Sequence, residues 1–164
     1  MVDFGKPVGL DPKGKALTVT AWAVSEKPTG IILAHGGPLN GYALLVHKGQ
    51  PVFMVRSKEK LAAVRGQAKI TDKLVHLAGV LTKDNELHLY VNGQQVAKAK
   101  GPGLVAGTPA QGLQIGADDG SPVGLYKSPF SFKGLIDEAH VYHRALAAEE
   151  IARAFDNGKV DPAG

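Results

Sequence analysis

Ala16-Leu-Thr-Val-Thr-Ala-Trp-Ala-Val24 is the stretch of the sequence that decides the fold class. Every second residue in it is small or aliphatic: Leu17, Val19, Ala21 and Ala23. Because successive side chains of an extended chain point to opposite faces, these residues share one face. A period of two predicts a β-strand with one buried face and excludes an amphipathic helix, in which the period is about 3.6 residues.

Short apolar or alternating segments of the same kind recur along the rest of the chain, with glycine or proline between them. They predict strands at Gly30–His35, Gly41–His47, Val52–Arg56, Leu61–Arg65, Leu74–Leu81, Glu86–Val91, Gly112–Ala117 and Phe132–His143. Asn92-Gly93 predicts a type I′ turn, because both central residues of that turn need a positive φ. Many short strands joined by tight turns are typical of an all-β sandwich of two sheets.

The spacing of apolar residues changes after the last predicted strand. Leu146, Ile151 and Phe155 recur at helical intervals, which predicts one short helix over Ala147–Phe155. Ala147 offers no side-chain oxygen to the first turn of this helix. The helix therefore depends on packing Ile151 and Phe155 against a sheet.

The length of 164 residues suits one domain, which we predict over residues 1–164 with its core at about residues 16–155. The chain has no cysteine, which excludes disulfides, thiolate zinc sites and cysteine nucleophiles. It has no apolar run of 18 residues, so we expect no membrane span and no membrane partner. No signal peptide is visible in the sequence.

The net charge of +4 is unevenly distributed. The segment from Lys48 to Lys73 holds seven lysines and arginines against Glu59 and Asp72. This excess fits either a patch for a polyanion, such as a sulfated glycan or a nucleic acid, or a solvated strand edge that its lysines keep soluble. We favour the edge and expect no nucleic-acid partner, because aromatic residues do not alternate with these charges.

Four phrases of the sequence, in this order, resemble strands of one known family. They are the first strand at 16–24, Val75-His76-Leu77-Ala78-Gly79-Val80, Leu89-Tyr90-Val91-Asn92-Gly93, and Phe132-Lys-Gly-Leu-Ile-Asp-Glu-Ala-His-Val-Tyr-His-Arg-Ala-Leu146 with the Ala148-Glu-Glu-Ile151 that follows. In these phrases the chain is similar to the laminin-G-like, concanavalin A-like lectin/glucanase domains. The resemblance implies a two-sheet antiparallel jelly-roll sandwich with one short C-terminal helix. Three residues depart from the family's pattern: Leu74 replaces Trp, Ala139 replaces Val and Ala147 replaces Ser.

The resemblance implies a non-catalytic accessory domain, which we expect to bind carbohydrate. Such domains are usually attached to secreted or periplasmic enzymes, sulfatases and glycoside hydrolases among them. We therefore expect a secreted or periplasmic location as part of a larger protein. The expected partner is a polysaccharide or other glycan, anionic ones included, or a neighbouring domain of the parent protein. The alternatives are a structural packing module with no soluble ligand and, least favoured, a glycosidase-like enzyme.

The carboxylates of the sequence offer no catalytic pair. Retaining glycosidases need two carboxylates about 5–5.5 Å apart. Asp137 and Glu138 are adjacent on a predicted strand, so we expect them on opposite faces. The sequence also lacks a Gly-x-Ser-x-Gly nucleophile motif and a phosphate-binding loop. We therefore expect no enzyme activity and no catalytic residue.

Asp137 is the first candidate for a metal ligand. In related jelly rolls the Asp of the closing strand often helps to hold one structural calcium ion against carbonyls of the N-terminal segment, and the resemblance implies this role for Asp137. The alternative is that Asp137 hydrogen-bonds the neighbouring chain without a metal. Asp118 and Asp119 are further calcium candidates, with an Asx-turn as the favoured alternative. The six histidines show no spacing typical of a zinc site.

Two loops combine aromatic rings with amides and carboxylates, which is the mixture that sugar binding uses. They run from His35 to Tyr42 and from Asp118 to Phe130. The candidate ligand-binding residues in them are His35, Asn40, Tyr42, Asp118, Asp119 and Tyr126. The alternative is that Tyr42, like Trp22, packs in the core and that the glycines of both loops only make turns.

Overall fold

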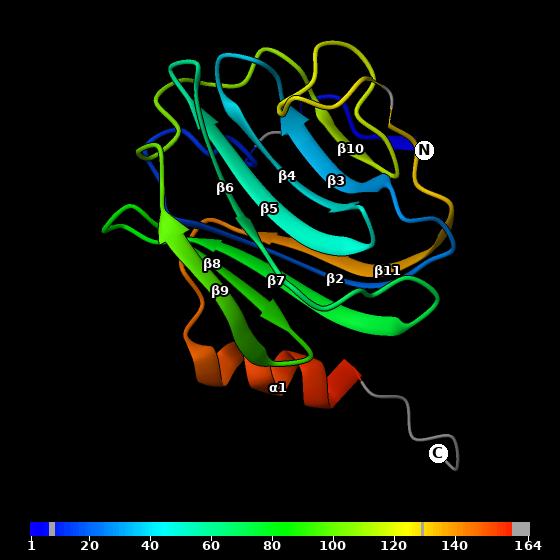
Figure 1. The fold of residues 1–164 in the computed structure, drawn as a ribbon. Helices are drawn as coiled ribbons and strands as arrows, with labels where there is room; N and C mark the ends of the chain where they lie inside the picture. Colours follow the sequence, from blue (N-terminus) through cyan, green and yellow to red (C-terminus); the bar gives the residue numbers. More distant parts are fainter. Residues whose placement is uncertain (7–8, 129, 159–164) are drawn as a thin grey trace.

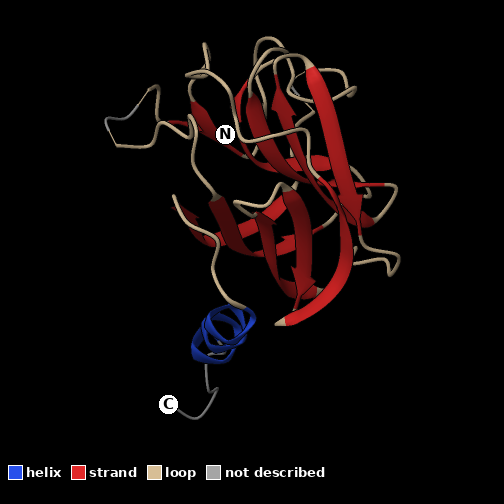
Figure 2. Cartoon of the chain, turned by 90° about the vertical axis from the view of Figure 1, so that its left-hand side faces the viewer, coloured by secondary structure: helices blue, strands red, loops and turns tan. Residues whose placement is uncertain are grey.

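Within residues 1–6, 9–128 and 130–158, which the computed structural model describes, eleven strands form two antiparallel sheets and one helix lies outside them (Figure 1). Sheet A has the strand order β1 (Val2–Asp3), β10 (Leu113–Ile115), β3 (Gly30–Gly36), β4 (Gly41–His47), β5 (Gln50–Ser57) and β6 (Lys60–Arg65). Sheet B has the order β11 (Gly134–Tyr142), β2 (Leu17–Ser25), β7 (Leu74–Leu81), β8 (Glu86–Val91) and β9 (Gln94–Lys100). The helix α1 (Ala148–Gly158) lies below sheet B, as the rotated view in Figure 2 also shows. The predicted all-β sandwich with one C-terminal helix is confirmed.

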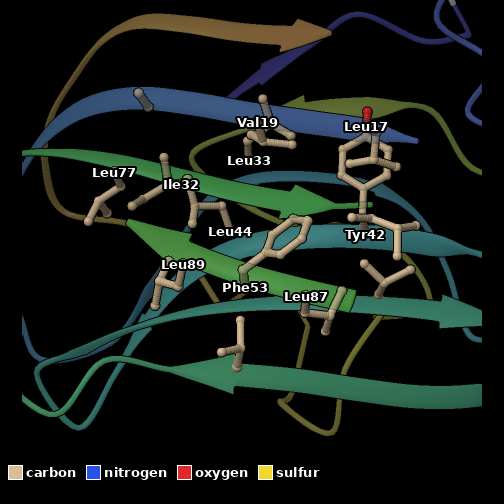
Figure 3. Packing of buried hydrophobic residues seen from close by; sticks show 14 of the residues in the cluster. Leu17, Val19, Ile32, Leu33, Tyr42, Leu44, Phe53, Leu77, Leu87 and Leu89 are labelled. Atoms are coloured by element: carbon tan, nitrogen blue, oxygen red, sulfur yellow. The ribbon is translucent and has the colours of Figure 1, made fainter. Parts of the chain in front are cut away.

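The core lies between the sheets and is filled by alternate side chains of their strands (Figure 3). The face of β2 that carries Leu17, Val19, Ala21 and Ala23 points into this core, and these residues are at most 2% exposed. Phe53 of β5 enters the core from sheet A and is fully buried. The first predicted strand is therefore confirmed, but it has no solvated face, because Thr18, Thr20 and Trp22 on its other side are at most 8% exposed.

Most strand boundaries agree with the predicted ranges, and the main differences are as follows. β10 is shorter than its predicted range, β1 and β9 lie outside every predicted strand, and α1 continues past Phe155 to Gly158. β1 consists of two exposed residues, so it shows no alternation from which it could be predicted. The φ angles of Asn92 and Gly93 are 51° and 78°, which confirms the turn geometry that these two residues predict.

A β-bulge interrupts β11 at Glu138. The register of β11 against β2 shifts between Asp137 and His140, and Glu138 has a φ of 48°. Asp137 and Glu138 consequently line the same groove. The prediction that these two carboxylates face opposite sides of the strand is wrong, because the bulge breaks the alternation on which it depended.

The helix α1 is held by packing, as its sequence predicts. Ile151 is fully buried against β7 and β8, and the ring of Phe155 lies 5.6 Å from the ring of Trp22, measured between centroids. At the start of the helix, Glu150 Oε1 accepts a hydrogen bond of 3.2 Å from the backbone N–H of Ala147. Glu150 thus supplies the half of a capping box that satisfies the N-cap amide, whereas the half that a Ser side chain at position 147 would supply is missing.

Gly79 of β7 is a point at which the two sheets touch. A Cβ added to Gly79 would lie 2.3 Å from Cγ of Phe53 in sheet A. We expect Gly79→Ala to lower the free energy of unfolding by about 2–3 kcal/mol, because an overpacked core must shift or strain. The midpoint of urea unfolding measures this loss.

Phe53→Leu is the matched partner variant, since it removes the ring that the new methyl group would meet. The double variant should lose less stability than the sum of the two single losses. Additive losses would show that the requirement for Gly79 comes from something other than Phe53.

Candidate functional site

The loop that begins at Asp118 crosses the outer face of sheet A and is part of the packed structure. Val123 in this loop is fully buried in a second apolar cluster with residues of β3, β4 and β5. Arg56 Nε donates a hydrogen bond of 2.6 Å to the carbonyl oxygen of Val123. The amide of Ile31 donates one of 2.9 Å to the carbonyl oxygen of Phe130. The loop therefore covers part of this face and leaves another part open.

The side chains of Tyr42 and His35 lie in the interior. Tyr42 is fully buried, His35 is 4% exposed, and His35 Nδ1 lies 3.3 Å from the Tyr42 hydroxyl oxygen. Burial raises the pKa of Tyr42 and lowers the pKa of His35 to about 4. In this structure neither side chain is open to a ligand at the surface, and their role as ligand-binding residues stays a prediction.

Asp118 stabilises its own loop through hydrogen bonds. Its side chain is buried, and its Oδ2 accepts hydrogen bonds from the Tyr126 hydroxyl and from the backbone N–H of Val123. The Ser128 hydroxyl donates to the backbone carbonyl of Asp118. Burial raises the pKa of the Asp118 carboxyl, although both hydrogen bonds favour its ionised form. Asp118 therefore positions Tyr126 through a hydrogen bond, and its role as a ligand-binding residue stays a prediction.

The open part of the outer face of sheet A is a hollow of about 430 Å³, which we call the outer groove. Its floor consists of aliphatic side chains and one methionine from β4, β5 and β6: Leu45, Val52, Met54, Leu61 and Ala63. Tyr126 and Phe130 form one wall, with stacked rings whose centroids are 5.2 Å apart at an angle of 20°. Leu125, which is 89% exposed, adds to this wall. The groove thus combines an apolar floor with aromatic side chains.

His47 and Arg65 supply the polar groups of the outer groove. Arg65 Nη1 donates hydrogen bonds to the carbonyl oxygen of His47 (3.0 Å) and to Gln50 Oε1 (3.2 Å), and its Nη2 lies 2.9 Å from His47 Nδ1. Burial, assisted by the charge of Arg65, lowers the pKa of His47. Within the described part of the chain Arg65 has no carboxylate partner. Its guanidinium is therefore a fixed and uncompensated positive charge in the groove.

The two predicted loops meet at a smaller hollow of about 260 Å³, which we call the rim cleft. Asn40 of the first loop and Ser121 of the second line it, together with Thr108 and Gln111. Gln111 Oε1 is buried there and has no hydrogen-bond partner in the described ranges, whereas Asn40 Oδ1 accepts a bond of 3.2 Å from the amide of Lys58. The structure thus brings Asn40 and the second loop together, but it places Tyr126 in the separate outer groove.

Asp119 is exposed and lines neither hollow. Sequence reasoning missed three residues of the outer groove: His47, Arg65 and Phe130. Arg65 belongs to the basic segment for which the sequence favours a solvated edge, and only its position on β6 beside the groove distinguishes it from the lysines around it. Phe130 lies at the end of the second predicted loop, and its stacking on Tyr126 is a tertiary signal that the sequence does not carry.

The surroundings of Asp137 supply few ligands for calcium. Asp137 is exposed, its Oδ1 accepts a hydrogen bond of 2.9 Å from the amide of Glu138, and the groove beside it is otherwise mostly apolar. Among the residues that the structure describes, no group of three or more His, Asp or Glu side chains lies together in a way that could hold a metal. Calcium takes about six to eight oxygen ligands. The side chains alone do not form such a site, so calcium at Asp137 stays a prediction.

The family of the chain follows from a family model described as the concanavalin A-like lectin/glucanases superfamily, which matches residues 2–152. The chain belongs to this family. No described helix is long and apolar enough to cross a membrane. A search of the curated proteins finds no match.

Several solved structures share the fold at low sequence identity. A heptameric SAP-like pentraxin from Limulus polyphemus has a TM-score of 0.68 at 14% identity, with 98% of this chain and 83% of that chain covered. The CBM40 domain of the Ruminococcus gnavus IT-sialidase, bound to α2,3-sialyllactose, has a TM-score of 0.70 at 15% identity and covers 93% and 92%. Domains LG4-5 of the mouse laminin α1 chain have a TM-score of 0.71 at 17% identity and cover 90% and 40%.

Two buried histidines make stability depend on pH. Burial lowers the pKa values of His35 and His76 to about 4, whereas an unfolded histidine binds its proton near pH 6.5. Because the unfolded state binds more protons between these values, stability is complete above pH 6.5 and is lost as the pH falls towards 4. Each histidine should cost about 2 kcal/mol at pH 5.

Urea unfolding at pH 7.5 and pH 5 measures this loss. His76→Phe keeps a ring of similar size against Trp22 and removes one titrating group. The difference in unfolding free energy between the two pH values should then shrink by about 2 kcal/mol. A difference that stays at the wild-type value would contradict the assignment to His76.

Thermal unfolding with and without calcium tests Asp137. An ion that binds only the native state raises the melting temperature by mass action. If Asp137 holds calcium, excess calcium should raise the midpoint over that in excess chelator, and Asp137→Asn should abolish the rise. Equal midpoints for the wild type in calcium and in chelator would remove the metal from Asp137.

Proposed function

We propose that this chain is a non-catalytic glycan-binding module and that its outer groove holds the glycan. The observation that carries the proposal is the stacked pair Tyr126 and Phe130 beside Arg65, whose charge has no partner among the described residues. The proposal includes attachment to, or excision from, a secreted or periplasmic carbohydrate-active enzyme or sulfatase.

The groups in the outer groove suit the two kinds of surface that a sugar presents. The apolar C–H faces of a sugar ring pack on aromatic side chains and on an apolar floor. A guanidinium binds carboxylate or sulfate groups through paired N–H donors. Because Arg65 is oriented by His47 and Gln50, its remaining donors need little reordering when they bind. The ligand class that fits best is therefore an anionic glycan.

Proteins of the same fold support a glycan ligand without identifying it. The CBM40 domain of the sialidase is bound to α2,3-sialyllactose, and cell entry of botulinum neurotoxin type C depends on interaction with two ganglioside molecules. The sialic acid of such glycans carries a carboxylate, which is consistent with a role for Arg65 in binding an anionic sugar.

Affinity gel electrophoresis in neutral and anionic polysaccharides tests the outer groove. Arg65→Gln should weaken retention in anionic gels about tenfold, since a charge-assisted hydrogen bond contributes about 1.5–3 kcal/mol. Lys60→Gln is the matched control: it removes the same charge from β6 at an exposed position outside the groove and should leave retention nearly unchanged. Added salt should release the anionic glycan.

Three further variants separate the aromatic wall of the outer groove from the rim cleft. Tyr126→Ala should abolish retention, whereas Tyr126→Phe keeps the stacking ring and should retain most of it. Asn40→Ala should change retention little, because Asn40 lines the rim cleft and not the outer groove. Unchanged retention of Arg65→Gln and Tyr126→Ala on every polysaccharide that the wild type binds would overturn the site, and no retention of the wild type on any would overturn the function.

A further inference from the structure

The helix α1 covers only part of the outer face of sheet B. It places Ile151 over β7 and β8. Next to its C-terminal end, three neighbouring strands bring Leu135, Val24 and Leu74 side by side in register. Leu135 is 70% exposed and Leu74 is 64% exposed. Large aliphatic side chains that are exposed together mark a surface suited to contact with another protein.

A groove of about 490 Å³ lies between these leucines and the end of α1, and we call it the helix-edge groove. Phe155 and Gly158 contribute to it from the helix, and Trp22 contributes from β2. Figure 1 shows α1 below sheet B, on the side away from sheet A. The helix-edge groove is therefore on the opposite side of the sandwich from the outer groove.

Two carboxylates lie at the helix-edge groove because of the bulge in β11. Both Asp137 and Glu138 line the groove and both are exposed. In the described ranges neither forms an ion pair with a lysine, arginine or histidine. On a chain with a net charge of +4, the groove is a local site of negative charge.

Trp22 provides a second, independent observation at the same place. Its side chain is only 8% exposed, and its buried indole Nε1 has no hydrogen-bond partner among the residues that the structure describes. A Cβ at Gly158 would lie 2.1 Å from this nitrogen, so the end of the helix lies directly over it. A buried donor without an acceptor destabilises the folded chain. A partner that brings an acceptor, with a small displacement of the helix end, would remove this cost.

We propose that the helix-edge groove docks a polypeptide segment of a partner protein that carries a lysine or arginine next to aliphatic side chains. The basic side chain pairs with Asp137 and Glu138, and the aliphatic side chains cover Leu74 and Leu135. A backbone carbonyl of the segment is the acceptor for the Trp22 indole. The carboxylates of the groove favour a basic residue in this segment, and the exposed leucines favour aliphatic residues beside it.

A sugar fits this groove less well than a polypeptide does. The ring of Trp22 is flanked by the rings of Phe155 and His76, at centroid distances of 5.6 Å and 5.2 Å, so it offers no open aromatic face. The most exposed apolar side chains of the groove are Leu74 and Leu135, whereas Phe155 is half-buried against Trp22. Paired carboxylates favour an ammonium or guanidinium group, because charge-assisted hydrogen bonds are the stronger ones. The docking proposal does not depend on glycan binding at the outer groove.

A display library of random heptapeptides, selected against the full chain in excess chelator, tests the proposal. Peptides that also bind the double variant Asp137→Asn/Glu138→Gln are subtracted. The remaining peptides should be enriched in lysine or arginine next to Leu, Ile, Val, Met or Phe. Failure to enrich any peptide, or enrichment without a basic residue, would overturn the proposal, and the chelator ensures that calcium does not mediate binding.

The indole N–H signal of Trp22 reports where an enriched peptide binds, because the chain has a single tryptophan. In a ¹H–¹⁵N NMR titration this signal should shift saturably, and the carboxylate double variant should bind at least tenfold more weakly. Leu74→Ser should weaken binding too, whereas Val96→Ser, at another exposed aliphatic residue outside the groove, should not. An indole signal that the peptide does not move, or that sialyllactose moves instead, would overturn the proposal.

Discussion

The contact between Phe53 of sheet A and Gly79 of sheet B determines how closely the two sheets approach. The ring occupies the space that a side chain at position 79 would need. Val19 and Leu89, the register neighbours of Gly79 on either side, are fully buried. Because protein interiors are densely packed, a larger residue at any of these positions would have to move a whole sheet. The rest of the sandwich depends on this close approach.

The inner faces of the two sheets pack against each other, so the apolar residues on each outer face need another segment of the chain to shield them from solvent. The outer face of sheet A is apolar in β3, β4 and β5, and the loop from Asp118 covers part of it through Val123. The outer face of sheet B is covered by α1 through Ile151. Neither cover is complete, and the outer groove and the helix-edge groove are the parts that remain open. The candidate sites thus arise from how far each cover extends.

Alternation along the sequence predicted the strands well but could not assign every face. In β2 the period of two identified the strand, but it did not decide which face is the inner one, and both faces are buried in the structure. β4 is apolar on both faces, so the sequence could not predict whether Tyr42 points into the core or away from it. The burial of Asp118 depends on Tyr126 and Val123 closing over it, which is a tertiary contact. The bulge at Glu138 could not be predicted from the sequence. A glutamate rarely adopts a positive φ, so the residue itself gives no sign of the bulge.

The two grooves differ in charge as well as in position. The outer groove contains an arginine without a carboxylate partner, and the helix-edge groove contains two carboxylates without a basic partner, both among the described residues. Because an exposed ion pair within the chain contributes little to stability, these charges can stay free for binding partners. Their separation on opposite sheets therefore suits a module that is fixed to a protein through one face while the other face stays free for an anionic glycan.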